Sequence, residues 1–502
     1  MAKSRPIFYN ALMLTGVNLL LRVVSTVFNV YLSRRIGAEG IGLVHLVLSV
    51  TAMATTAGIG GIRTTTMYLC AEELGRKQEP SIPWILSGCF LYSLFCSAAV
   101  ASIVYFFAPD ISAEWIGVSE AAPALRFFSA FLPVICLSSV MSGLFTAASR
   151  IGTLAAVEIA EQLCSMGVTL LLLQIYAGHI PSRAAIAVLF GSGAGACVTL
   201  LSLVRIRRKE KNPVGPRIPV ARRILSAAVP LALADNLKAC ISTTENLMVP
   251  KRLALFPGTD APLALFGTVC GMVFPVIMFP AAILFGLAEL LIPEMARCSA
   301  AASHSRIRYL VRRSLRVTLI YSLAVAGILY LLSDTLCTAL YQTDASAPYL
   351  RMFSPVIPML YCDIVTDSMV KGLGQQKICV RYNILTSAMD VAFLYFLLPK
   401  YGMNGYYFSF VVTHLLNFIL SLRKLLQLTG QKITPYVPVL AVSDALAAGF
   451  LCGKIPIMPG RLIAFPMVLL ALLQVTGVVR QEDFTWIKQL VTAKTPAPKG
   501  RR

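Results

Sequence analysis

Charged residues are scarce in this chain of 502 residues: Asp, Glu, Lys and Arg make up only 13% of it, whereas 57% of the residues are hydrophobic. Soluble proteins are about 25% charged and about 45–50% apolar. A soluble fold of this length could not keep so much apolar surface from water. The same composition excludes a disordered chain, a coiled coil and a secreted disulfide scaffold. The remaining class is a polytopic, all-helical integral membrane protein.

Metal-ligating and catalytic patterns are also lacking. The chain has four histidines, and its 13 cysteines form no C-x-x-C pair. Most cysteines lie inside apolar runs, which is typical of small buried side chains and not of bridges or ligands. There is no phosphate-binding loop, no nucleophile elbow and no loop long enough to fold as a catalytic domain. We therefore predict a protein that is not an enzyme and has neither a metal nor a cofactor.

Long apolar runs dominate the sequence instead. A bilayer core of about 30 Å requires about 20 apolar residues per helix. The first run follows Lys3 and Arg5, is too long for a signal peptide and is expected to remain as the first span. Breaks at Gly, Pro and charged residues then predict about 14 transmembrane helices, at residues 8–33, 41–69, 83–107, 122–146, 152–176, 184–206, 223–249, 262–290, 315–340, 348–370, 378–398, 403–422, 435–453 and 462–479.

The distribution of positive charge predicts an orientation. The formal net charge is +21. If the amino terminus is cytoplasmic, the inside segments hold 31 of the 44 Lys and Arg residues and the outside loops hold eight. Cytoplasmic loops of membrane proteins carry such an excess. We therefore predict that both termini are cytoplasmic and that the basic charge reflects topology, with no nucleic-acid partner.

Two short similarities indicate an internal repeat. LRFFSAFLP at 125–133 matches LRMFSPVIP at 350–358, and NVYLSRRI at 29–36 resembles NLMVPKRL at 246–253. One such match arises by chance in an apolar chain, but two in the same order favour duplication. An even number of spans separates each pair, so the halves share their orientation, as in transporters that rock two lobes about a central site.

The repeat predicts two parallel six-helix lobes and two extra C-terminal helices. The boundaries are an N-terminal lobe at 1–206, a basic cytoplasmic linker at 207–222, a C-terminal lobe at 223–426, and two helices with a basic tail at 427–502.

An ordered set of motifs resembles a known family. The motifs are RRIGAEGIGL at 34–43, TAGI at 56–59, VPKRL at 249–253, GMVFP at 271–275 and KGLGQQK at 371–377. They are similar to those of the stage V sporulation protein B group of polysaccharide-biosynthesis proteins, in the multidrug/oligosaccharidyl-lipid/polysaccharide exporter superfamily. The resemblance implies a flippase for an undecaprenyl-diphosphate-linked oligosaccharide or peptidoglycan-type precursor. It also implies a bacterial plasma membrane and a role in spore or cell envelope biogenesis. Which polyprenyl-linked glycan is carried, lipid II or another, stays open.

Three cations lie within predicted spans. Arg22, Arg63 and Lys238 are expensive to place in hydrocarbon, at about 2.5–3.5 kcal/mol each on insertion scales. Arginine binds phosphate bidentately. We therefore predict that these three cations, with Asn18 and Asn29 on the face of Arg22, line a shared cavity and bind the lipid diphosphate. Alternatively, Lys238 neutralises Asp235 three residues earlier, and Arg63 extends to the interface.

Embedded carboxylates are candidates for ion coupling. Closely placed carboxylates can hold a proton or Na⁺. The candidates are Glu158, Glu161, Asp235, Glu245, Asp363 and Asp367. Static pairing, such as Asp367 with Lys371, is the alternative, and the sequence does not choose between H⁺, Na⁺ and membrane potential as the driving force.

The sequence thus predicts an alternating-access flippase whose partners are a lipid-linked sugar diphosphate and membrane lipids. Two other functions remain open: a multidrug cation antiporter of the same superfamily, and a membrane scaffold for envelope enzymes that transports nothing.

Overall fold

The computed structural model describes residues 4–75, 81–148, 150–177, 180–208, 220–431, 436–455 and 458–479. Every regular element in these ranges is helical, so the predicted fold class is confirmed. The first half of the described chain contains the helices α1 (Ser4–Ile59), α2 (Ile62–Gly75), α3 (Ile82–Phe106), α4 (Ala108–Asp110), η2 (Ile111–Ile116), η3 (Ser119–Ala121), α5 (Ala122–Ala147), α6 (Ile151–Leu172), η4 (Leu173–Ala177) and α7 (Pro181–Arg208).

The second half begins after the predicted linker, most of which lies outside the described residues. Its helices are α8 (Ala221–Leu253), α9 (Pro262–Phe266), η5 (Gly267–Val273), α10 (Phe274–Ala300), α11 (His304–Leu331), α12 (Ser333–Tyr341), α13 (Ala347–Phe353), η6 (Ser354–Val356), α14 (Ile357–Gly372), α15 (Gln376–Thr429), α16 (Tyr436–Gly453) and α17 (Met458–Val475).

Ten of the described helical stretches are long and apolar enough to span a membrane. Two of them, Leu19–Leu74 and Gln376–Thr429, are 56 and 54 residues long, which is enough for two crossings each. Backbone kinks at Gly37 and Gly402, with φ of 73° and 55°, divide these helices. With the segment 347–372 and the shorter apolar helix α17, the chain has about 14 membrane-crossing helices, as the sequence predicts.

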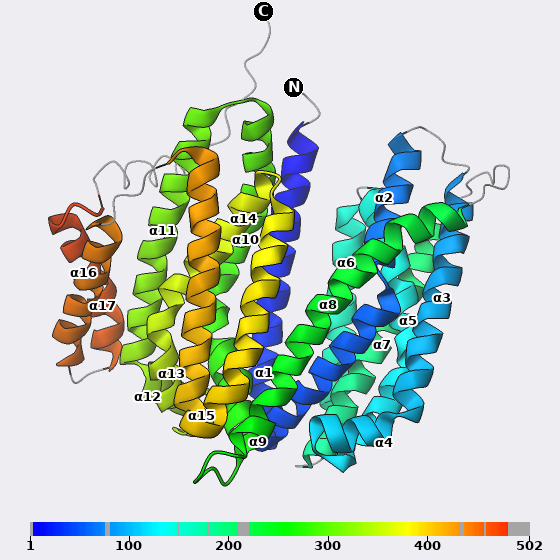
Figure 1. Cartoon of the computed structure of the whole chain (residues 1–502), viewed down its shortest axis with the longest axis horizontal. Coiled ribbons are helices and arrows are strands. Elements are labelled where there is room, and N and C mark those ends of the chain that lie inside the picture. The colour runs from blue at the N-terminus through cyan, green and yellow to red at the C-terminus, as the bar shows by residue number, and fades with distance from the viewer. Residues whose placement is uncertain are drawn as a thin grey trace, which may run out of the picture.

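The helices form two groups, which Figure 1 shows side by side. One group contains α2, α3, α5, α6 and α7, and the other contains α10, α11, α14 and α15. The groups meet at the end of the molecule where α8 leads into α9, the lower end in Figure 1, and diverge toward the end where α1 begins. We refer to these as the α9 end and the α1 end. The hairpin of α16 and α17 packs on α11 at the edge of the second group.

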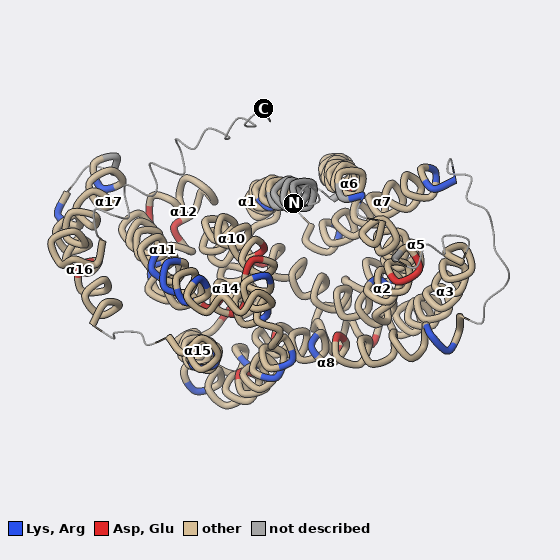
Figure 2. The backbone as a smooth tube through the Cα atoms, turned by 90° about the horizontal axis from the view of Figure 1, so that it is seen from above, with Lys and Arg blue, Asp and Glu red and all other residues tan. Residues whose placement is uncertain are grey.

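Helices α1 and α8 connect the two groups. In the view along the helices, α1 and α8 lie on opposite sides of the space between the two groups (Figure 2). Near the α1 end, α8 contacts α2 and α3 of the first group, and it also packs along α15 of the second. In turn, the early part of α1 lies against α10. Each half of the chain therefore contributes its first helix to the seam between the groups.

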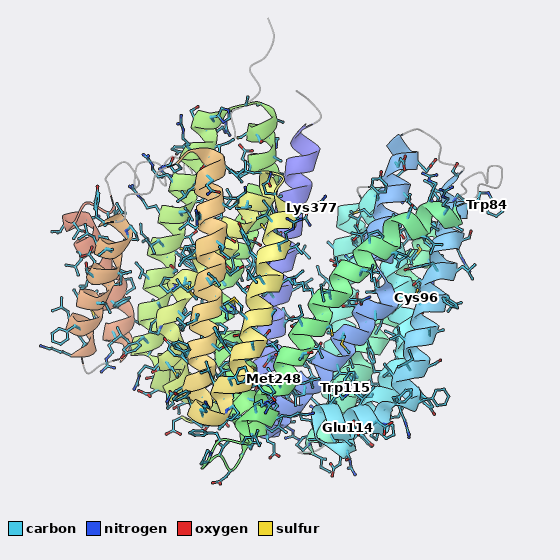
Figure 3. The ribbon with its side chains drawn as sticks, viewed as in Figure 1. Trp84, Cys96, Glu114, Trp115, Met248 and Lys377 are labelled. Atoms are coloured by element: carbon cyan, nitrogen blue, oxygen red, sulfur yellow. The ribbon has the colours of Figure 1, made fainter. Side chains whose placement is uncertain are left out.

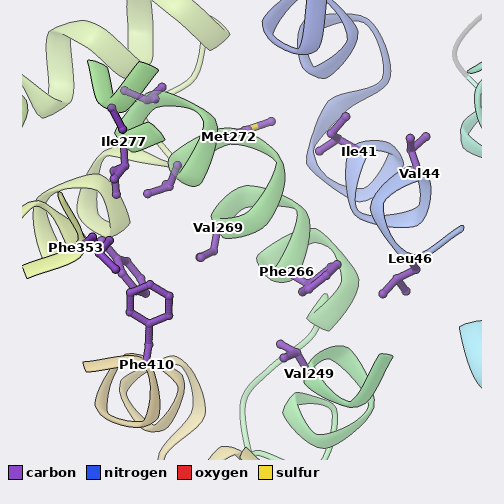
Figure 4. Packing of buried hydrophobic residues seen from close by; sticks show 14 of the residues in the cluster. Ile41, Val44, Leu46, Val249, Phe266, Val269, Met272, Ile277, Phe353 and Phe410 are labelled. Atoms are coloured by element: carbon purple, nitrogen blue, oxygen red, sulfur yellow. The ribbon is translucent and has the colours of Figure 1, made fainter. Parts of the chain in front are cut away.

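One large hydrophobic cluster joins the groups at the α9 end. Figure 4 shows part of it: Ile41 and Leu46 from α1, Val249 from α8, and Phe266 and Met272 from the stretch that follows. These five side chains are at most 3% exposed. Within a bilayer such helix contacts are held by close van der Waals packing and not by removal of apolar surface from water. The cluster therefore makes the α9 end the firmly closed end of the molecule.

The repeated segments have the same burial pattern. In 125–133 the positions Leu125, Phe128 and Ser129 are buried, and the arginine that follows Leu125 is exposed. The matching leucine, phenylalanine and serine of 350–358 are buried as well, again with an exposed arginine after the leucine. Both segments open a helix that runs from the α9 end toward the α1 end. This correspondence supports the predicted parallel repeat.

Candidate functional site

A break in the helical chain between α1 and α2 positions Arg63. Gly60 and Gly61 both have positive φ, at 51° and 69°, which few residues other than glycine adopt. A Cβ on Gly61 would lie 2.8 Å from the carbonyl oxygen of Ala228, so glycine here also allows α8 to approach closely. Arg63 follows in the first turn of α2. The break thus places a cation beside the middle of α8.

The break and α8 together line an open cavity of about 430 Å³. The residues that line it are Thr56, Ile59, Gly61, Arg63, Thr64, Asp235, Lys238, Ala239 and Ser242. Arg63, Asp235 and Lys238 are all exposed side chains. The structure therefore brings two of the three predicted cations into one polar cavity between the first and second halves of the chain. We call it the central cavity.

The two cations of the central cavity have few partners. The nearest carboxylate oxygen to Arg63 is that of Glu158 on α6, at 3.9 Å, and the two side chains are 55% and 27% exposed. An exposed pair at this distance is worth about 0–1 kcal/mol. Lys238 forms no ion pair with Asp235 or with any other residue that the structure describes. Both cations therefore remain available to an anion that enters the cavity.

Arg22 lies apart from this cavity. Its guanidinium carbon is 3.9 Å from the centre of the Phe285 ring of α10, and the carboxylate of Glu289 on the same helix is its electrostatic partner. The side chain is exposed. Asn29, seven residues on, is half-buried and accepts a hydrogen bond from Ser33 at 3.3 Å. The side chain of Asn18 lies outside the described residues.

The predicted acidic residues divide into separate environments. Glu161 accepts a hydrogen bond of 2.6 Å from Thr199 of α7, whereas Glu158 lies near Arg63. Asp367 pairs with Lys371 at 2.6 Å, which is the static pairing that the sequence left open. Asp363 accepts a hydrogen bond of 3.0 Å from the amide of Asn417 on α15.

Four buried oxygen atoms at this α14–α15 contact have no hydrogen-bond partner among the described residues. They belong to Asp363, Asp367, Asn417 and Ser421. Asn417 and Ser421 are only 8% and 1% exposed. Because unpartnered buried oxygens are costly, this contact favours a bound proton or water.

A second buried acidic group joins α8 to α15. Glu245 neighbours Asp390, which is 4% exposed. One oxygen of Asp390 accepts hydrogen bonds from Ser409 at 2.5 Å and Thr413 at 3.2 Å. The sequence shows Asp390, like Glu245, as an acidic residue embedded in an apolar run, but it does not pair the two. The hydroxyl residues Ser409 and Thr413, four apart in the next span, are a further signal for this site.

The α9 end is closed by polar contacts as well as by the hydrophobic cluster. Arg34 donates hydrogen bonds to the carbonyl oxygens of Ala339 and Leu340 at the end of α12. Lys251 donates to the carbonyl oxygen of Glu114 in η2. At Gly267 a Cβ would lie 1.9 Å from the carbonyl oxygen of Ala38, so the two halves are in backbone contact there. The two halves of the chain are therefore in direct contact at the α9 end.

Within the described ranges, no group of three or more His, Cys, Asp and Glu side chains is arranged to hold a metal ion. The molecule has two groups of helices, a polar cavity at their seam and one closed end. These features define a polytopic membrane transporter.

The comparisons with known proteins agree with this class. The family description "Polysaccharide biosynthesis protein" matches residues 7–247, and the description "MatE" matches residues 263–396. Over these two ranges the chain is similar to the transporter families of the MOP superfamily, which are not families of enzymes.

Individual relatives are distant. Stage V sporulation protein B of Bacillus subtilis strain 168 is 20% identical over 406 residues, which are 78% of each chain. The structure of the lipid II flippase MurJ in an inward closed conformation superposes with a TM-score of 0.69 at 13% identity, covering 94% of this chain and 99% of that one. An inward-facing multidrug resistance MATE family transporter superposes with a TM-score of 0.66 at 15% identity, covering 83% and 98%. At these identities the solved structures show the shared fold.

Proposed function

We propose that the protein is a flippase that carries an undecaprenyl-diphosphate-linked oligosaccharide or peptidoglycan-type precursor across the bacterial plasma membrane. The observation that carries this proposal is the position of Arg63 and Lys238 in one cavity, without strong partners. Two cations at the seam of a transporter suit an anionic head group better than a cationic drug. The similarity to stage V sporulation protein B supports a role in spore or cell envelope assembly.

The chemistry of the substrate fits the chemistry of the cavity. A lipid diphosphate carries about two negative charges, and arginine and lysine both bind phosphate, arginine bidentately. The sugar-diphosphate head crosses through the polar cavity, whereas the polyprenyl tail stays in lipid. This avoids the cost of moving an unpaired charged head through hydrocarbon. Arg22 provides a third cation on α1, where Phe285 and Glu289 hold it.

Transport follows from alternation between two arrangements of the helix groups. In the structure the α9 end is closed and the groups diverge at the α1 end. Basic segments of the sequence lie at the α1 end, including the start of α8 and the α10–α11 connection. This position supports the proposal that the α1 end faces the cytoplasm. The substrate enters from the cytoplasmic side, and its binding shifts the population toward an outward-open state.

Buried carboxyl groups couple the transition to an ion. Glu245 and Asp390 connect α8 with α15, so protonation or Na⁺ binding at this pair changes how α8 is held by the second group of helices. Two neighbouring buried carboxyl groups favour a shared proton or a bound cation, because two negative charges repel each other. The unpartnered oxygens of Asp363 and Asp367 are a second candidate for such an ion.

A multidrug cation antiporter is the second candidate function, because Asp235 also lines the central cavity. The experiment that separates the two uses the purified full-length protein in sealed vesicles. A fluorescent undecaprenyl-diphosphate sugar is placed in one leaflet, and a membrane-impermeant quencher reports its movement. A fluorescent amphipathic cation is tested in parallel vesicles.

We expect protein-dependent movement of the lipid-linked sugar and none of the cation. Uptake of the cation alone would establish the antiporter, and movement of neither would leave a scaffold that transports nothing. Vesicles without protein and vesicles with an unrelated helical membrane protein serve as controls for passive movement.

A further inference from the structure

A second cavity lies on another face of α8, toward the α9 end. It has a volume of about 630 Å³. Its walls come from α1, η2, α8 and α15, and the lining residues used below are Met53, Trp115, Cys240, Leu247, Arg252 and Tyr395. Figure 3 shows Trp115 and Met248, another lining residue, close to each other near this end. The body of this groove is apolar. We call it the α8 groove.

Two adjacent cations occupy one end of the α8 groove. The guanidinium carbon of Arg252 lies 3.3 Å from the centre of the Tyr395 ring, a cation–π contact that fixes the plane of the guanidinium. Lys251, which also lines the groove, donates to the carbonyl oxygen of Glu114. Neither cation forms an ion pair with a carboxylate in the part of the chain that the structure describes. An apolar groove that ends in two unpaired cations is complementary to an anionic lipid.

The α8 groove adjoins the central cavity along the same helix. Ala239 and Ser242 line the central cavity, and their neighbours Cys240 and Thr243 line the groove. The cations of the groove lie about three to four helical turns beyond Lys238, at 1.5 Å per residue, and so near the membrane boundary at the α9 end. A lipid could therefore pass from one site to the other along α8 with its tail in the bilayer.

We propose that the α8 groove is the release site of the transported lipid. It binds the diphosphate at Lys251 and Arg252 and the first isoprene units against Leu247 and Trp115. This inference rests on the proposed flippase function. Two adjacent cations match the two phosphates of a diphosphate, whereas a phospholipid offers a single phosphate. Opening of the α9 end breaks the contact between Lys251 and Glu114 and frees the ammonium group for the substrate.

Cys240 provides the readout, because it lines the groove and is the exposed one among the 13 cysteines. The full-length protein in phosphatidylcholine vesicles is treated with a membrane-permeant maleimide, and labelling is measured on the peptide that contains Cys240 by mass spectrometry. The probe is undecaprenyl diphosphate. Parallel samples contain phosphatidylglycerol or inorganic diphosphate in its place.

We expect undecaprenyl diphosphate to slow the labelling of Cys240, and phosphatidylglycerol and inorganic diphosphate to leave it unchanged at the same concentration. Arg252→Gln should raise the concentration needed for half protection roughly tenfold, the value for one lost charge-assisted hydrogen bond. Arg183→Gln is the matched control, because Arg183 also lies over a tyrosine, Tyr176, at 5.3 Å, but outside the groove.

A second variant tests the apolar part of the site. Thr244→Trp places an indole in the groove, which Thr244 lines, without changing its charge. We expect this variant to lose protection of Cys240 while its thermal unfolding stays close to that of the wild type. Equal protection by phosphatidylglycerol would reassign the groove to an ordinary membrane lipid and overturn the proposal. Unchanged protection in Arg252→Gln would overturn it as well.

The experiment also distinguishes this inference from the proposed function. Protection of Cys240 without any movement of lipid-linked sugar in sealed vesicles would contradict the flippase and leave a lipid-binding groove. Movement of the sugar that depends on Arg63 and Lys238, with no protection of Cys240, would contradict only the release site.

Discussion

Arg34 and Lys251 occupy matching positions in the two repeated segments, and each donates hydrogen bonds to backbone carbonyl oxygens in the opposite half of the chain. Arg34 reaches α12 in the second half, and Lys251 reaches η2 in the first. Both acceptors precede the helix that opens with the repeated Leu-Arg segment. The closed α9 end is thus held by two reciprocal contacts, which the internal repeat makes equivalent.

We expect Arg34→Gln and Lys251→Gln to favour opening of the α9 end. A hydrogen bond from a charged group contributes about 1.5–3 kcal/mol, so each loss shifts the equilibrium about tenfold or more toward the open arrangement. The measurement is labelling of a cysteine introduced at Thr56 in the central cavity by an impermeant maleimide added from outside.

Lys400→Gln is the control, because Lys400 is an exposed cation at the same end that forms no such contact with the residues that the structure describes. Labelling that rises equally in this variant would show that any loss of positive charge opens the molecule, and so contradict a role for the reciprocal contacts.

Asp235 is expected to oppose binding of an anionic substrate. It faces the central cavity together with Arg63 and Lys238, so Asp235→Asn removes a negative charge from the site. We expect the apparent affinity for the lipid diphosphate to rise, by about tenfold at low salt and less at high salt. Binding to the protein in detergent, measured at two salt concentrations, checks this.

Asp260→Asn, an exposed carboxylate in the loop before α9, should leave that affinity unchanged. Weaker binding of the diphosphate in Asp235→Asn, with loss of binding of an amphipathic cation, is the result that a cation antiporter would give.

Arg22 is expected to assist transport from its place on α1. Arg22→Ala should lower the initial rate of flipping at least tenfold, because it removes a charge-assisted contact to phosphate. Phe285→Leu should lower the rate only about two- to fivefold, since an exposed cation–π contact contributes about 0.5–1 kcal/mol. Rates are compared at equal membrane abundance, and unimpaired flipping in Arg22→Ala would remove this residue from the substrate path.

Asp390 is expected to carry the ion dependence of transport. Asp390→Asn keeps the size of the side chain and its contacts with Ser409 and Thr413 but removes the ionisable group. We expect flipping to become independent of an imposed proton or Na⁺ gradient. The matched control is Asp444→Asn, since Asp444 is also buried and accepts a hydrogen bond from a threonine, Thr476, at 2.7 Å. Loss of ion dependence in both variants would argue against a specific site at Asp390.

The fold follows from the sequence in most respects, for clear physical reasons. Hydrocarbon thickness fixes the length of each span, so the number of crossings can be counted from the apolar runs. The helix breaks are less visible: Gly37 and Gly402 lie in sequences that continue as helices on either side. The packing of early α1 against α10, and of the start of α8 against α2, depends on contacts far apart in the chain. No local sequence pattern shows that the first helix of each half packs against the other group of helices.

The central cavity and the acidic pair could be predicted from the sequence only in part. The cost of burying a charge identifies Arg63 and Lys238 as residues that need an aqueous cavity, and the structure places both in one. The same cost identifies Arg22, but its contact with Phe285 depends on how α10 packs against α1. The partner of Glu245 could not be chosen either, because the register of α8 against α15 decides which carboxyl group it meets.

The most direct test of the central cavity is the rate of flipping in sealed vesicles by the double variant Arg63→Gln, Lys238→Gln. We expect no movement of the fluorescent lipid-linked sugar above that in protein-free vesicles, at normal abundance and thermal stability. The double variant Arg126→Gln, Arg351→Gln, which removes the matching exposed cations of the repeated segments, should retain flipping. Wild-type flipping in Arg63→Gln, Lys238→Gln would contradict the proposal that these two cations bind the diphosphate.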